Sequence, residues 1–68
     1  MKVFITGGAG FAARALMKYW KEPEYTVYSR GERAQTECRL KFPHARYVLG
    51  DIRDRERLKE AMRGADIV

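Results

Sequence analysis

The chain has 68 residues, of which 46% are hydrophobic and 34% are charged, and its formal net charge is +5. This composition is typical of one small globular domain and excludes an intrinsically disordered chain. A single cysteine and a single histidine exclude an internal disulfide and are too few for a structural zinc site, and no stretch approaches the roughly 20 apolar residues of a membrane span.

The first predicted element is a strand over residues 2–6, whose consecutive apolar side chains suit a strand covered on both faces. Because this strand follows Met1 at once, the sequence leaves no room for a signal peptide, and we expect a cytoplasmic protein. A helix is predicted from about Gly10 to Trp20, and Pro23 ends this unit because it cannot continue a helix. The inward stripe of this helix is expected to consist of Phe11, Ala15, Leu16, Tyr19 and Trp20.

The same alternation of strand and helix then repeats. Residues 25–28 are rich in β-branched and aromatic side chains and predict a second strand. A second helix is predicted from Glu32 to about Phe42, where Pro43 follows. Residues 46–49 form the third predicted strand, which ends at Gly50.

A third helix is expected next, with either Asp51 or Asp54 as its N-terminal cap and Gly64 just beyond its C-terminus. Its inner face is expected to consist of Leu58, Ala61 and Met62. Residues 66–68 open a fourth strand. The fold class is therefore α/β, with a parallel sheet of order three-two-one and the fourth strand beside the first, because strands that alternate with helices connect by right-handed crossovers.

A glycine-rich turn joins the first strand to the first helix. Gly7 can adopt a positive φ, so the chain can turn sharply out of the strand. Gly10 has no side chain to hold a phosphate away from the backbone, and the N–H groups of the following helix point at such a ligand. This arrangement predicts a site for a dinucleotide pyrophosphate, against the alternative of an ordinary turn in an α/β protein. The residues of this predicted site are Thr6, Gly7, Gly8, Ala9, Gly10, Phe11 and Ala12.

The end of the second strand predicts which dinucleotide binds. An acidic residue there would bind a free ribose 2′-hydroxyl and favour NAD, but this chain has Ser29 and Arg30. A guanidinium binds a 2′-phosphate through two parallel hydrogen bonds, so we expect a preference for NADP, with NAD possible. Arg33, one helical turn further, and Arg14 are expected to add positive charge. The alternative is that these arginines are only solvated.

Asp51 and Ile52 follow the third strand directly. The Asp51 carboxylate can accept a hydrogen bond from an adenine amino group, and the Ile52 N–H can donate to a ring nitrogen. Asp51 is equally suited to cap a helix or to pair with Arg53. Adenine binding by Asp51 is compatible with either of these local roles.

These residues together resemble the extended short-chain dehydrogenase/reductase family. The resemblance rests on Thr6-Gly7-Gly8-Ala9-Gly10-Phe11, on Gly50-Asp51-Ile52-Arg53-Asp54 and on Gly64-Ala65-Asp66-Ile67-Val68. The segments Val27 to Glu32 and Lys41 to His44 are more specific. They are similar to bacterial nucleotide-sugar dehydratases and epimerases of polysaccharide biosynthesis, above all to the UDP-N-acetylglucosamine 4,6-dehydratase (inverting) group.

The resemblance covers all 68 residues and about the first fifth of such an enzyme. It implies a partial Rossmann domain over residues 1–68 that binds NADP. In that domain Gly7, Gly10 and Ala13 would form the phosphate loop, Ser29, Arg30 and Arg33 would hold the 2′-phosphate, and Asp51 and Ile52 would hold the adenine. The family's catalytic Tyr-x-x-x-Lys does not occur here, so we expect no catalytic residue and no complete activity from this chain alone. A UDP-sugar is expected as substrate only in the full-length enzyme.

Two departures from the family pattern stand out. Ala12-Ala13 replaces the common large residue plus glycine, and Gly31 stands where this group usually has an acidic residue.

Two other functions compete with this interpretation. The net charge of +5 fits a small basic nucleic-acid-binding module, but the basic residues are spread among nine acidic ones and form no recognised motif. We therefore expect no nucleic-acid partner. The chain could also be a non-catalytic truncated remnant, whose exposed first-strand edge would favour a homo-oligomer, a swapped dimer or aggregation.

Overall fold

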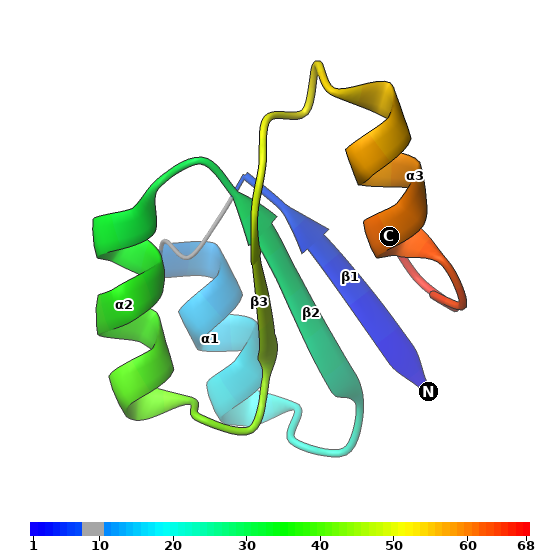
Figure 1. Ribbon diagram of the computed structural model, residues 1–68. Coiled ribbons are helices and arrows are strands. Elements are labelled where there is room, and N and C mark those ends of the chain that lie inside the picture. The colour runs from blue at the N-terminus through cyan, green and yellow to red at the C-terminus, as the bar shows by residue number, and fades with distance from the viewer. Residues whose placement is uncertain (8–10) are drawn as a thin grey trace.

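The computed structural model describes residues 1–7 and 11–68, with the backbone alone at residue 11. Strands and helices alternate along the chain, as Figure 1 shows. Their bounds lie within one residue of the predicted ones wherever the expectation falls on described residues. The elements are β1 (Lys2–Thr6), α1 (Phe11–Tyr19), β2 (Glu24–Ser29), α2 (Glu32–Lys41), β3 (Arg46–Leu49) and α3 (Arg55–Met62).

The three strands form a parallel sheet in which β2 lies between β1 and β3. On the far side of β1, Ile67 forms a parallel bridge with Val3, and the Phe4 N–H donates to the Ile67 carbonyl at 2.8 Å. The sheet thus has the predicted order three-two-one, with the fourth strand beginning beside the first. This is the arrangement of an N-terminal, Rossmann-like α/β unit.

Helices cover both faces of the sheet, with α1 and α2 on one side and α3 on the other (Figure 1). The core lies between the sheet and the first two helices. On that face Val3, its register partner Tyr25 and Val27 pack with Met17 of α1 and Cys38 of α2. The opposite face of the strands carries Phe4 and Tyr28, whose rings are also buried. β1 is therefore covered on both faces, as its sequence predicts.

The predicted inward stripe of α1 is wrong. Ala13 and Met17 are the buried residues of this helix, whereas Leu16 is 37% exposed and Tyr19 is 80% exposed. Ala15 is half-buried and Trp20 exposed, and the Phe11 side chain lies outside the described residues. The helix turns its i, i+4 row of Ala13 and Met17 to the sheet, because the small Ala13 lets the helix approach closely.

α3 packs more loosely than α1 and α2. Asp54, rather than Asp51, caps it by accepting a hydrogen bond from the Arg57 N–H, and Gly64 has the expected positive φ of +81° beyond its end. Its predicted inner face, Leu58, Ala61 and Met62, is only half-buried. No residue of α3, a helix that the structure describes in full, is buried. None of the helices in the described part of the chain is both long and apolar enough to cross a membrane.

Candidate functional site

The carboxyl ends of the three strands meet at one edge of the sheet. There the chain leaves β1 at Gly7, whose φ of +74° confirms the predicted sharp turn. The Gly7 N–H donates to the Tyr28 carbonyl at 3.1 Å, and the Gly50 N–H donates to the Ser29 carbonyl at 2.9 Å. A cavity of about 410 Å³ opens at this edge. Its lining residues are Gly7, Ser29, Arg30, Gly31, Gly50, Asp51, Ile52 and Arg53.

Tyr28 lies next to two residues of this edge, Gly50 and Asp51. Its side chain is fully buried, packs against the Phe4 ring, and donates a hydrogen bond from its hydroxyl to the Asp51 carbonyl at 2.9 Å. A Cβ atom at Gly50 would lie 2.3 Å from the Tyr28 hydroxyl oxygen, so only glycine leaves room for the ring. Sequence reasoning placed Gly50 at the end of a strand but missed this packing role, because the contact joins residues 22 positions apart.

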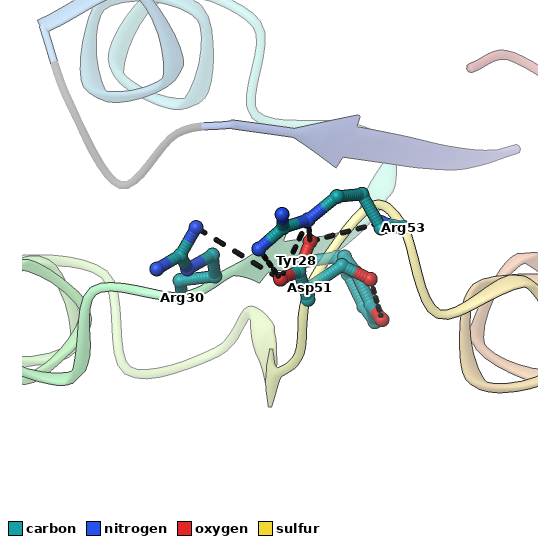
Figure 2. A network of polar contacts seen from close by, with 4 residues as sticks. All are labelled: Tyr28, Arg30, Asp51 and Arg53. Atoms are coloured by element: carbon teal, nitrogen blue, oxygen red, sulfur yellow. Dashed lines mark hydrogen bonds and ion pairs between the residues drawn. The ribbon is translucent and has the colours of Figure 1, made fainter.

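Two guanidinium groups converge on the Asp51 carboxylate, as Figure 2 shows. Arg53 binds it most closely, through Nη2 at 2.8 Å from Oδ2, through Nε at 3.2 Å from both oxygens, and through its backbone N–H at 2.9 Å from Oδ1. Arg30 Nη1 lies 3.8 Å from Oδ2. The hydrogen bonds from Arg53 lower the pKa of Asp51 to about 2, and they raise the pKa of Arg53. Asp51 is thus an anion that arranges two cations at the cavity.

Ser29 and Arg30 occupy the end of β2, where the sequence predicted a 2′-phosphate site. Both residues line the cavity, where Ser29 is almost completely buried and the Arg30 side chain is 70% exposed. Ile52, which is exposed, completes the group. The structure therefore brings together Gly7, Ser29, Arg30, Asp51 and Ile52 of the predicted site residues.

The other predicted residues that the structure describes do not line this cavity. Arg33 and Arg14 both pair with the Glu37 carboxylate of α2, at 3.8 and 3.7 Å. Thr6 is exposed at the end of β1, and Ala12 is exposed in the first turn of α1. Gly8, Ala9, Gly10 and the Phe11 side chain lie outside the described residues, so the pyrophosphate contacts expected of them stay predictions.

Arg53 and Gln35 are two residues that the sequence did not assign to the site. Arg53 lines the cavity, and only its nearness to Asp51 in the chain signalled a role. Gln35 of α2 is buried behind the cavity and donates to the Ser29 hydroxyl. No local pattern distinguishes this glutamine from a solvated one on a polar helix.

Comparison with known proteins places this geometry in context. Residues 3–68 match the model of the NAD dependent epimerase/dehydratase family. The chain is 40% identical over 72 aligned residues to a UDP-N-acetylglucosamine 4,6-dehydratase (inverting) of Campylobacter jejuni, and 33% identical over 75 to a UDP-glucose 4-epimerase of Rickettsia akari. Each alignment covers 97% of this chain and 22% of the relative. The chain thus spans about a fifth of the length of these relatives.

Proposed function

Because this chain belongs to the NAD dependent epimerase/dehydratase family, we propose that it binds the adenosine half of NADP within a nucleotide-sugar dehydratase or epimerase. The family implies a nicotinamide dinucleotide, and the preference for NADP is the proposal. One observation carries the proposal. At the carboxyl edge of the sheet, where Gly7 follows β1, the residues Ser29, Arg30 and Asp51 lie around a single cavity. Dinucleotides bind at this edge of doubly wound sheets.

The groups at the cavity suit the parts of this ligand. The exposed Arg30 guanidinium offers two parallel N–H donors to a 2′-phosphate, and no carboxylate from the end of β2 repels that phosphate. The Asp51 carboxylate accepts from the adenine amino group, sharing its oxygens with Arg53, and the Ile52 N–H donates to a ring nitrogen. The backbone of the Gly7 turn faces the pyrophosphate.

The relatives' names give the substrate class that we propose for the whole enzyme. A UDP-sugar would lose a hydride from its C4 position to the nicotinamide and later receive it back, so that the cofactor is recycled. For this chain we propose the adenosine site alone and none of the groups that transfer the hydride. Enzymes of surface polysaccharide biosynthesis are the context that the resemblance favours.

Calorimetric titration with 2′,5′-ADP and with 5′-AMP tests the cofactor preference, because these ligands differ only by the 2′-phosphate. A charge-assisted hydrogen bond contributes about 1.5–3 kcal/mol, so Arg30→Ala should weaken 2′,5′-ADP binding by about 10- to 100-fold and leave 5′-AMP binding nearly unchanged. Arg63→Ala is the matched control, because Arg63 is similarly exposed, pairs with Glu60 and lies outside the cavity.

Equal affinity of the wild-type chain for the two nucleotides would contradict the preference for NADP. If neither 2′,5′-ADP nor 5′-AMP binds, the adenosine site itself is contradicted.

A further inference from the structure

Gln35 is one of two polar or charged residues that are buried in the described part of the chain, and the other is Ser29. It lies one turn into α2 and is only 3% exposed. Its side-chain nitrogen, Nε2, lies 2.8 Å from the Ser29 hydroxyl oxygen, 2.9 Å from the Val48 carbonyl oxygen and 3.4 Å from the Ser29 carbonyl oxygen. One amide therefore joins α2 to the ends of both β2 and β3.

The Val48 carbonyl determines which way this amide points. A carbonyl oxygen can only accept hydrogen bonds, so the NH₂ group of Gln35, and not its oxygen, must face Val48. The same NH₂ group then donates its second hydrogen to Ser29 Oγ. Within the described residues, the Ser29 hydroxyl accepts this bond and finds no acceptor for its own hydrogen. Because Ser29 lines the cavity, that hydrogen remains for an acceptor bound there.

We propose that Gln35 is a positioning residue that makes the Ser29 hydroxyl a hydrogen-bond donor to the 2′-phosphate and thereby raises the preference for NADP over NAD. This inference rests on the proposed function. A phosphate dianion only accepts hydrogen bonds and gains a charge-assisted bond from a donor held in place. A ribose hydroxyl is itself a donor and an acceptor, so it gains less from a partner whose polarity is already fixed.

A purely structural role of Gln35 would have a different consequence. The bond to Val48 also ties β3 to α2, so loss of the amide is expected to lower stability whatever the ligand. Such a loss of stability would weaken the binding of 5′-AMP and of 2′,5′-ADP alike, because the two nucleotides share every group except the 2′-phosphate. The ratio of the two dissociation constants, that for 5′-AMP divided by that for 2′,5′-ADP, is therefore the informative measurement.

The test compares this ratio among the wild-type chain, Gln35→Met, Ser29→Ala and the double variant. Methionine keeps the length and lack of branching of glutamine but cannot donate to Ser29. We expect Ser29→Ala to lower the ratio by about 10- to 100-fold, which is the range of one charge-assisted hydrogen bond, and Gln35→Met to lower it by no more than Ser29→Ala does. We expect the double variant to lower it no further than Ser29→Ala alone, because Gln35 acts through Ser29.

An unchanged ratio in either folded single variant would overturn the inference, as would a further fall of the ratio when Gln35→Met is added to Ser29→Ala. If Gln35→Met does not fold, Gln35→Leu replaces it as the variant without an amide, and an unchanged ratio in Ser29→Ala still contradicts the donor role. A failure of this inference is distinct from a failure of the proposed function. If only this inference fails, Arg30→Ala still lowers the ratio. If the proposed function fails, Arg30→Ala leaves the ratio unchanged.

Discussion

At the scale of single residues, two glycines that look alike in the sequence have different roles. A Cβ at Gly50 would collide with the buried Tyr28 ring, whereas a Cβ at Gly31 would meet only Ala34 at 3.7 Å. We predict that Gly50→Ala lowers the free energy of unfolding by about 1–3 kcal/mol, the usual cost of overpacking. Gly31→Ala, the control, should change it little. Urea denaturation measures both, and equal stabilities would contradict the close packing of Tyr28 on Gly50.

The Asp51 carboxylate predicts a dependence of stability on pH. Its pKa is about 2 in the folded chain, below the ordinary value of about 3.9 expected when unfolded. A carboxyl group whose pKa is lowered in the folded chain stabilises the fold at pH values above its pKa in the unfolded chain. This contribution disappears as the pH falls from about 4 towards 2. Asp51→Asn should therefore destabilise the chain at pH 6 and have a much smaller effect at pH 2.

Free energies of unfolding of both proteins across this range provide the measurement. Because the Asp51–Arg53 pair is solvent-accessible, added salt should shrink the difference at pH 6. A difference that is independent of pH would show that Asp51 acts through its shape rather than its charge.

Much of the site could be predicted at this scale, because its residues follow strands. The ends of parallel strands meet at one edge, so Gly7, Ser29 and Asp51 come together once the strands are recognised. Gln35 could not be predicted in the same way. Its role depends on a contact with Val48 across an interface between a helix and the sheet, and no local pattern encodes that contact.

At the scale of elements, the sequence predicts where helices and strands lie but not which side of α1 packs inward. Pro23, Pro43 and Gly50 interrupt the chain at clear positions, so the bounds follow from them. α1 carries apolar residues around much of its circumference, so periodicity alone does not select a face. The small side chain of Ala13 decides it, because close approach to the sheet buries more surface than the larger Tyr19 would allow.

The loose packing of α3 makes its N-terminal cap unusually important. Asp54 accepts from the Arg57 N–H at 3.2 Å, and replacing such a cap by alanine costs a helix about 1 kcal/mol. We predict that Asp54→Ala accelerates hydrogen exchange of the amides in residues 57–62 and barely affects those of β2, because α3 opens without the core. Asp54→Ser should restore protection, since serine also caps. Equal acceleration in β2 would show instead that α3 opens only when the whole chain unfolds.

At the scale of the whole molecule, the sheet is organised around its central strand. β2 pairs with both neighbours, and Val27 and Tyr28 on its two faces are fully buried. The strand that ends at the site residue Ser29 and leads into Arg30 is thus paired on both sides and buried on both faces. Cavity and core share this strand, so binding at the cavity is coupled to the stability of the entire chain.

This coupling leads to a final prediction. A 68-residue domain is marginally stable, and a ligand that binds only the folded state adds about 2.7 kcal/mol at a concentration 100 times its dissociation constant. For a domain of this size, that corresponds to a rise in Tm of about 10–20 °C. We expect this rise with 2′,5′-ADP, whose groups match Gly7, Ser29, Arg30 and Asp51, and a smaller one with 5′-AMP at the same concentration. Nicotinamide mononucleotide is the control, because it lacks both the adenine and the 2′-phosphate that the cavity is proposed to bind, so it should leave Tm unchanged. An equal rise with all three compounds would mean that the chain responds to phosphate in general, and the adenosine site would have to be abandoned.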